Sequence, residues 1–175
     1  WAEKFNMGGN DSGEGVAADS KGNIIVTGYS YIDNQYDVYT VKYDRNGLMI
    51  WKVLSQDDHD DFAYDVAVDS FDNIIVAGMT MGRSRADTTS SFLILKYDKD
   101  GNLLWRTQYD DSQANGMCVA LDFEGDIIVT GYVHNGNNFD YKTAKFSKDG
   151  ELLWHKSYNA GKDDKAYGIA IDKKD

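Results

Sequence analysis

A ten-residue phrase occurs three times along the chain, and each copy ends in tryptophan. It reads KYDRNGLMIW at 42–51, KYDKDGNLLW at 96–105 and KFSKDGELLW at 145–154. Together with Trp1, these tryptophans are separated by 50, 54 and 49 residues, so the sequence has a regular period. A repeat of this length is typical of solenoids, propellers and arrays, in which one unit buries its faces only by stacking against its neighbours.

A second phrase follows each tryptophan and indicates β-structure. Its copies are GVAADSKGNIIVTGYS, DVAVDSFDNIIVAGMT and CVALDFEGDIIVTGYV, and a fourth begins as YGIAID. β-Branched and aromatic residues dominate these runs, and no stretch sustains the three-and-four spacing of an amphipathic helix. We therefore expect strands, joined by tight turns where Gly, Asn and Asp interrupt the runs.

Each repeat reads as a meander of four antiparallel strands. In the third complete repeat, the strands are expected at about 116–122, 126–133, 139–146 and 150–158. The first two strands of each repeat are apolar on both faces, so each sheet must be covered on two sides, as in radially stacked blades. The sequence therefore predicts an all-β fold: a β-propeller fragment of four-stranded antiparallel blades, with about three complete blades plus flanking strands.

The whole chain, 1–175, is expected to form one propeller segment. Its repeats run approximately over 1–50, 51–104, 105–153 and, in part, 154–175. This arrangement does not close a ring, since propellers have about 4 to 8 complete blades. We therefore expect further repeats of the same chain, or an assembly, to close the ring.

The charge of the chain disfavours several classes of partner. With 29 Asp and Glu against 18 Lys and Arg, the formal net charge is −11, which repels phosphate backbones and anionic membrane surfaces. We therefore expect no nucleic-acid partner. No apolar run approaches the roughly 20 residues of a membrane span. The single cysteine, Cys118, has no partner for an internal disulfide.

The tryptophan phrase is interpreted as a structural device. Aspartate and glycine make a turn, and the tryptophan packs onto a neighbouring blade, because a large aromatic side chain buries much area. The residues of this structural repeat are Trp1, Trp51, Trp105, Trp154, Gly47, Gly101 and Gly150. The lysine that opens each phrase is expected to pair with a recurrent aspartate of a neighbouring strand, because a partly buried charge needs a partner. The lysines are Lys42, Lys96 and Lys145, and the aspartates are Asp19, Asp69, Asp122 and Asp172.

The phrases GNIIVTGYS and KYDKDGNLLW, with the period near fifty residues, resemble the SBBP type of β-propeller repeat. Such repeats occur widely in secreted and cell-surface proteins of bacteria and archaea. The resemblance covers nearly the whole chain. It implies a non-catalytic scaffold or binding module that meets protein or glycan partners outside the cell or at its surface.

A glycine precedes each of three tryptophans, in Gly47 to Trp51, Gly101 to Trp105 and Gly150 to Trp154. This spacing also resembles the tryptophan-docking repeat of quinoprotein propellers. This similarity implies an alternative function as part of a propeller enzyme, either a quinoprotein-like oxidoreductase or a glycan-acting hydrolase. The chain lacks the adjacent cysteine pair of catalytic quinoproteins. It also contains no nucleophile elbow, phosphate-cradling loop or cysteine and histidine arrangement that would name a reaction. The non-catalytic function is therefore favoured.

Variable connections, rather than the repeated turns, form the candidate binding face. In a propeller, the connections after the second and fourth strands of each blade emerge on one face, and here they are the long ones. We call this the long-loop face and its opposite the tight-turn face. Variable loops on a rigid scaffold are where binding usually occurs. The candidate binding residues are Tyr36, Asp57, Asp58, His59, Asp60, Asp61, Asp110, Asp111, Phe139, Asp163 and Asp164, and Phe62 adds a further aromatic side chain to this face.

The acidic loop around His59 is also a candidate calcium site, because calcium prefers oxygen ligands. The candidate ligands are Asp57, Asp58, Asp60 and Asp61. Their spacing matches no known calcium loop, and solvated charge is the ordinary state of such a run. No other cofactor is expected. We expect partner binding on the long-loop face and little from tight turns such as those at Lys21 and Lys99.

Overall fold

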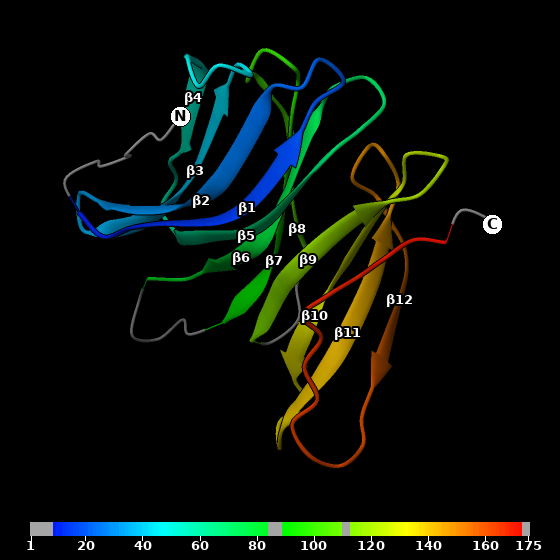
Figure 1. The fold of residues 1–175 in the computed structure, drawn as a ribbon. Helices are drawn as coiled ribbons and strands as arrows, with labels where there is room; N and C mark the ends of the chain where they lie inside the picture. Colours follow the sequence, from blue (N-terminus) through cyan, green and yellow to red (C-terminus); the bar gives the residue numbers. More distant parts are fainter. Residues whose placement is uncertain (1–8, 84–88, 110–112, 173–175) are drawn as a thin grey trace.

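The computed structural model describes residues 9–83, 89–109 and 113–172. Within these ranges the chain forms strands and no helix, and the strands make three four-stranded antiparallel sheets (Figure 1). Accordingly, none of the described residues lies in a helix that is long and apolar enough to cross a membrane. The predicted all-β fold of propeller blades is confirmed.

The strands of each blade are hydrogen-bonded in chain order, as in a meander. The first blade contains β1 (Asp11–Ala18), β2 (Ile24–Ile32), β3 (Gln35–Tyr43) and β4 (Met49–Ser55). The second contains β5 (Asp60–Val68), β6 (Ile74–Met81), β7 (Ser90–Tyr97) and β8 (Leu103–Tyr109). The third contains β9 (Ala114–Leu121), β10 (Ile127–His134), β11 (Phe139–Phe146) and β12 (Leu152–Tyr158). The third blade matches the predicted strand bounds to within two residues.

The first strand of a blade lies against the preceding blade. β5 contacts β1, β2 and β3, and β9 contacts β5, β6 and β7. Each of these first strands has an irregular register at the same repeat position, which leaves Glu14, Tyr64 and Met117 as extra residues. Such a bulge bends a strand and increases its twist. The repeated bulge therefore gives the three first strands the same curvature.

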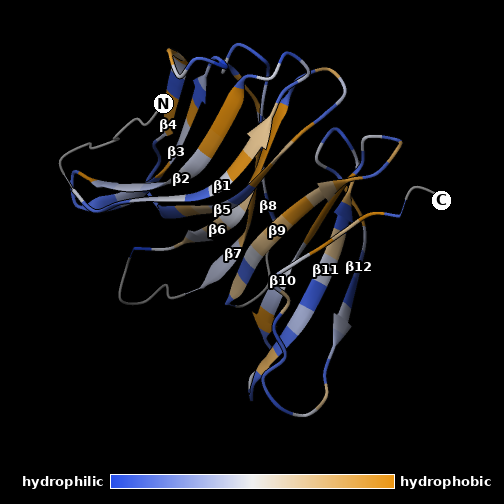
Figure 2. Cartoon of the chain, viewed as in Figure 1, coloured by the Kyte–Doolittle hydropathy of each residue, from blue (hydrophilic) through white to orange (hydrophobic). Residues whose placement is uncertain are grey.

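The core consists of two layers, one at each boundary between blades. Neighbouring residues of β6 point to opposite layers: Ile74 and Val76 pack between the first and second blades, and Ile75 and Ala77 between the second and third. This alternation explains why both faces of the second strands are apolar. Figure 2 shows hydrophobic colouring on β1, β2 and β9, more hydrophilic colouring on β11 and β12, and hydrophilic colouring in most turns and loops.

The outward faces of the first and third blades expose residues of the kind that the inner faces bury. Val16 is 68% exposed, whereas its repeat equivalents Val66 and Val119 are 6% and 7% exposed, because a preceding blade covers them. At the other end, Trp154 is 43% exposed, and every residue of β12 is exposed. Trp1 lies outside the described residues. The two outward faces thus have the composition of faces that pack against a blade.

After β12 the chain runs on over 159–172 without forming a strand. The YGIAID phrase at 167–172 repeats the sequence of a first strand, and the ring of Tyr167 lies 6.2 Å from that of Tyr132 in the third blade. In the three sheets, a first strand pairs with the second strand of its own blade. Within the described residues, no second strand pairs with 167–172.

Trp51 and Trp105 dock onto the next blade, as predicted for the tryptophans of the repeat. A Cβ atom placed on Gly101 would lie 3.0 Å from the ring of Trp51, and one on Gly150 would lie 3.2 Å from the ring of Trp105. Both glycines have a positive φ, 89° and 88°, which residues with a side chain rarely adopt. The indole Nε1 of Trp51 also donates to the carbonyl oxygen of Lys99, 3.0 Å away. Each turn glycine therefore closes a hairpin and makes room for the preceding blade's tryptophan.

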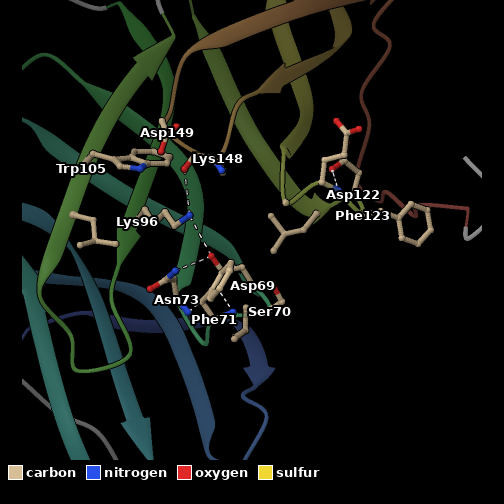
Figure 3. A pocket seen from close by; sticks show the side chains of 15 residues that line it. Asp69, Ser70, Phe71, Asn73, Lys96, Trp105, Asp122, Phe123, Lys148 and Asp149 are labelled. Atoms are coloured by element: carbon tan, nitrogen blue, oxygen red, sulfur yellow. Dashed lines mark hydrogen bonds and ion pairs between the residues drawn. The ribbon is translucent and has the colours of Figure 1, made fainter.

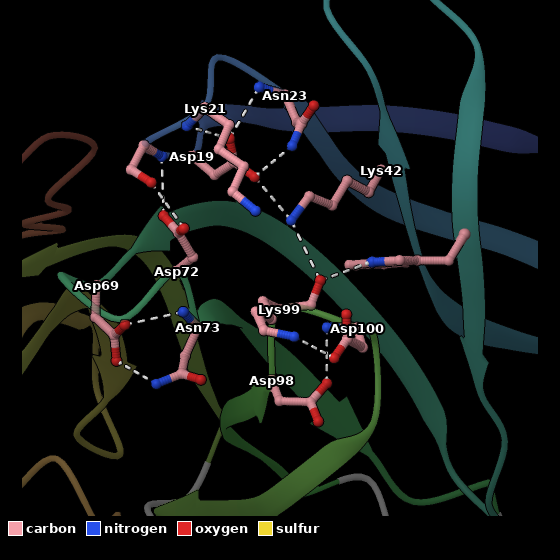
Figure 4. Close-up of polar contacts among 12 residues, drawn as sticks. Asp19, Lys21, Asn23, Lys42, Asp69, Asp72, Asn73, Asp98, Lys99 and Asp100 are labelled. Carbon is pink, nitrogen blue, oxygen red and sulfur yellow. Dashed lines mark hydrogen bonds and ion pairs between the residues drawn. The ribbon is translucent and has the colours of Figure 1, made fainter.

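The predicted lysine–aspartate pairs are confirmed. The Nζ to Oδ2 distances are 2.8 Å for Lys42–Asp19, 3.2 Å for Lys96–Asp69 and 2.7 Å for Lys145–Asp122. Lys42 Nζ also lies 3.2 Å from the carbonyl oxygen of Lys99 in the next blade, to which it donates (Figure 4). Lys96 Nζ donates in the same way to the carbonyl oxygen of Lys148, also at 3.2 Å. The first two pairs therefore tie each blade to the turn of the following one.

Candidate functional site

The acidic loop between β4 and β5 is held by an arginine from β8. Arg106 donates from Nη1 to Asp61 Oδ2 at 2.7 Å and from Nη2 to Asp61 Oδ1 at 3.3 Å, while Asp57 Oδ2 lies 2.8 Å from Nη2. Asp61 is fully buried. Burial opposes the charge of the guanidinium, but the two carboxylates more than compensate and raise the pKa of Arg106. Asp57 and Asp61, two of the predicted binding carboxylates, thus both form ion pairs with Arg106 within the chain.

Two further predicted carboxylates fasten neighbouring segments together. Asp60 Oδ1 accepts a hydrogen bond from the backbone amide of Tyr36 at 2.9 Å, and Asp163 Oδ1 accepts the equivalent bond from Phe139 at 3.0 Å. The backbone amide of Asp164 donates to the carbonyl oxygen of Phe139 at 2.6 Å. In both cases a residue at the start of a repeat caps the third strand of the preceding blade. These aspartates position loops on the long-loop face.

The most exposed part of the acidic loop is its centre. Asp58 is exposed, and the side chain of His59 is 43% exposed, with its Nδ1 3.4 Å from Asp57 Oδ1. In the part of the chain that the structure describes, no group of three or more His, Cys, Asp or Glu residues is arranged to hold a metal ion. Calcium binding by this loop stays a prediction. Asp110 and Asp111 lie outside the described residues.

An aromatic cluster lies beside this loop. Phe62 of β5 is at its centre, with ring centroids 5.0 Å from Tyr29 and 4.8 Å from Tyr36. Tyr31 extends the cluster at 4.9 Å from Tyr36, and Tyr64 stacks 6.5 Å from Phe62. Tyr31 is exposed and the other four rings are partly exposed. The cluster, hereafter the tyrosine cluster, therefore presents a rigid aromatic surface made from two blades.

A related arrangement recurs on the third blade, with a cation in place of the central ring. Tyr132 and Phe139 occupy the repeat positions of Tyr29 and Tyr36. Lys165, at the position of Phe62, places its Nζ 4.1 Å from the centroid of the Phe139 ring and 4.6 Å from that of Tyr132. Contact of this kind between a cation and a ring face is attractive.

Sequence reasoning identified Tyr36, Phe62 and Phe139 but missed the other residues of these clusters. The available signal was the repeat itself, because aligning the three copies of GYS, GMT and GYV places Tyr29 and Tyr132 at one position. A second missed group is Asp37, which is buried and accepts a hydrogen bond from Gln35 Nε2 at 2.7 Å. Burial, together with the nearby aspartate charges, raises the pKa of Asp37.

Comparison with known proteins supports a propeller-type repeat. No protein-family model matches the chain. The chain is 30% identical over 96 residues to an uncharacterised WD repeat-containing protein of Acanthamoeba polyphaga mimivirus. The match covers 45% of this chain and 7% of that relative, so the chain spans a small part of the relative's length. Together with the three blade-like sheets, this similarity supports a repeat of the propeller type. Assignment to the SBBP type stays a prediction.

Proposed function

We propose that this chain is part of a propeller-type scaffold or binding module that takes a protein partner through its long-loop face. The tyrosine cluster carries this proposal. It brings five aromatic rings together from β2, β3 and β5, and it leaves each of them at least partly accessible. Tyrosine and phenylalanine are enriched in protein interfaces, where their rings supply large contact areas, and tyrosine is enriched among the residues that dominate binding energy.

The scaffold beneath the cluster supports this function. Blades that are tied by tryptophan docking and by lysine–aspartate pairs hold the strand ends in fixed positions. Binding residues on loops and strand ends of a rigid scaffold lose little conformational freedom when a partner binds. The similarity to a WD repeat-containing protein of Acanthamoeba polyphaga mimivirus points to the same class of module.

The charge of the chain indicates the chemistry of the partner. The net charge is −11, and the exposed Asp33 and Asp58 lie on the long-loop face near the tyrosine cluster. A cationic protein surface complements such a field, and its association weakens as salt shortens the screening length to about 8 Å at physiological ionic strength. The partner meets this module outside the cell or at its surface, in keeping with the resemblance to the SBBP repeat.

Binding to arrays of basic, aromatic-containing peptides tests the proposal. We expect Tyr31→Ala and Asp58→Asn to weaken peptide retention, with the effect of Asp58→Asn disappearing at high salt. Leu48→Ser on the tight-turn face is the matched control, because Leu48 is also exposed. Retention that is unchanged in both long-loop variants contradicts the proposal. So does binding to neutral glycan arrays alone, which would favour the glycan-acting alternative.

A further inference from the structure

A cavity of about 660 Å³ opens on the tight-turn face between the second and third blades. Its walls come from the β5–β6 turn, the β9–β10 turn, the β11–β12 turn and β8. Figure 3 shows Trp105 and Lys148 along one side, Ser70 and Phe71 along another, and Phe123 across the gap. The volume is within the roughly 300 to 1,000 Å³ of ligand pockets. This groove, hereafter the 2–3 groove, lies on the face opposite to the tyrosine cluster.

The equivalent place between the first and second blades is closed by a pair of hydrogen bonds. The Ser20 backbone amide donates to Asp72 Oδ1 at 2.9 Å, and Ser20 Oγ donates to Asp72 Oδ2 at 2.8 Å. At the next boundary, the repeat places Ser70 where Ser20 stands and Gly125 where Asp72 stands. Glycine has no side chain to reach Ser70, and a Cβ atom on Gly125 would meet nothing within 4 Å. We call the pair formed by Ser20 and Asp72 the latch. The 2–3 groove is therefore open because one residue of the equivalent latch is missing.

Aromatic side chains stand at the open boundary where the other repeats have polar ones. Phe71 is 79% exposed and Phe123 is 61% exposed, and both line the groove. The position of Phe71 is taken by lysine and glutamate in the other two blades, and that of Phe123 by serine in both. Leu104 and Trp105 add apolar surface from β8. Exposed apolar surface rimmed by polar groups is typical of interaction sites.

The charges around the groove favour a cationic partner. Four carboxylates and two lysines line it. Lys96 is already paired with Asp69, and Lys145, from outside the lining, pairs with both Asp122 and Asp126. Glu124 and Asp149 then remain against Lys148, which leaves the rim with a net negative charge. A lysine or arginine beside an apolar side chain complements this combination.

We propose that the 2–3 groove is a docking site for an extended segment of a partner protein. The segment places an apolar side chain between Phe71, Phe123 and Trp105 and a lysine or arginine against Glu124 or Asp149. This site is independent of the long-loop face, because the two surfaces lie at opposite ends of the blades and share no residue.

A fluorescein-labelled pentapeptide, Lys-Leu-Lys-Phe-Lys, is the probe that tests this site by fluorescence anisotropy. The decisive variant is Gly125→Asp, which supplies the missing half of the latch. Aspartate fits this turn, because Asp72 adopts a φ of 63° at the same position and Gly125 has a φ of 81°. We expect Gly125→Asp to weaken binding about tenfold or more, equivalent to about 1.4 kcal/mol, while its melting temperature stays equal to or above that of the parent.

Two further variants distinguish binding of the peptide in the groove from non-specific adsorption to exposed apolar residues. Phe71→Ser with Phe123→Ser keeps the groove open but removes its exposed rings, and it should also weaken binding about tenfold. Leu48→Ser, which changes an exposed apolar residue of a tight turn outside the groove lining, should leave binding unchanged. Absence of saturable binding to the parent protein overturns the proposal. Binding that survives both Gly125→Asp and the double phenylalanine variant, or that is lost in Leu48→Ser, also overturns it.

Discussion

The boundary between the first two blades and the boundary between the last two are built from the same repeat positions but closed by different chemistry. On the long-loop side, the first boundary contains the buried Asp61 and its ion-pair partner Arg106. Histidine and alanine, His155 and Ala114, stand at the corresponding positions of the second boundary. There, Tyr109 packs 6.0 Å from Phe146 and 5.8 Å from the ring of His155. An ionic boundary thus stands beside an aromatic one.

The two boundaries differ again on the tight-turn side. The first is latched by Ser20 and Asp72, whereas the second lacks the latch and opens into the 2–3 groove. The shared parts are the docked tryptophans and the lysine–aspartate pairs, which occur at both boundaries. The comparison teaches that the repeat supplies the stacking and that a few variable positions decide whether a boundary is sealed or accessible.

The ionic boundary should be the most sensitive to a single substitution. Arg106→Ala leaves Asp61 buried without its partner, and we expect it to lower the free energy of unfolding by roughly 3 to 5 kcal/mol. The matched change at the aromatic boundary, His155→Ala, removes an exposed side chain and should change stability by less than about 0.5 kcal/mol. Urea unfolding of both variants checks this. Equal losses of unfolding free energy in Arg106→Ala and His155→Ala would contradict the distinction between the two boundaries.

Tryptophan docking is common to both boundaries, so its loss should be costly wherever a following blade is present. Trp105→Ala should destabilise the protein by about 3 kcal/mol, the lower end for a core aromatic, because Trp105 is partly exposed. Trp154→Ala, at the outward face of the third blade, is the control and should have a smaller effect in this chain. A melting temperature that is unchanged in Trp105→Ala would rule out the packing role.

The lysine–aspartate pairs should make stability depend on pH in the acid range. Burial raises the pKa of Asp19, but hydrogen bonds from Lys42, Asn23 and backbone amides lower it from 3.8 to about 2. The ionised carboxylate therefore stabilises the fold above pH 3.8, and this contribution is lost as the pH falls from 3.8 towards 2. Asp19→Asn should cost about 2 kcal/mol at pH 7 and flatten the pH dependence in that window. Thermal melts from pH 7 to pH 2 measure this, and an unchanged slope would contradict it.

The latch should contribute less, because its residues are at the surface. Asp72→Ala should lower the free energy of unfolding by about 1 kcal/mol, as for an ordinary hydrogen bond. Gly125→Asp should restore a similar amount at the other boundary. Chemical denaturation of the two variants measures both effects. Stabilisation by Asp72→Ala, or marked loss of stability in Gly125→Asp, would show that the latch does not work as described.

Among these tests, the addition of calcium is expected to have the smallest effect on stability. Arg106 and the Tyr36 amide already engage Asp57, Asp61 and Asp60, which leaves Asp58 as the most accessible carboxylate of the loop. We expect the melting temperature in 1 mM calcium to differ from that in chelator by less than about 2 °C. A larger rise that disappears in Asp58→Asn would establish a calcium site.

The sequence predicted the parts of the structure that repeat. Strand positions, the docking of Trp51 and Trp105, and the lysine–aspartate pairs all followed from aligning one repeat with the next, because a periodic sequence puts equivalent residues in equivalent surroundings. The long-loop face was predicted from loop length, but the use of its carboxylates was not. Arg106 lies on an outer strand, 45 residues from Asp61, and nothing in the local pattern links the two.

The 2–3 groove was missed for a different reason. We expected the tight-turn face to offer little for binding because its turns are short and similar, and the cavity lined by Phe71 and Phe123 is the observation on which we propose otherwise. The signal was present as a departure from the repeat. The sequence SKGN becomes SFDN in the second blade and FEGD in the third, so the two phenylalanines and Gly125 stand out once the copies are aligned.

Amide hydrogen exchange at two equivalent serines tests most directly the claim that variable positions seal one boundary and open the other. The Ser20 amide donates to Asp72, whereas Gly125, at the repeat position of Asp72, has no side chain that could accept a hydrogen bond from the Ser70 amide. We predict slow exchange at Ser20, fast exchange at Ser70, and slower exchange at Ser70 in Gly125→Asp. Equal protection of the two serines in the parent protein, or no gain of protection at Ser70 in that variant, would contradict the account.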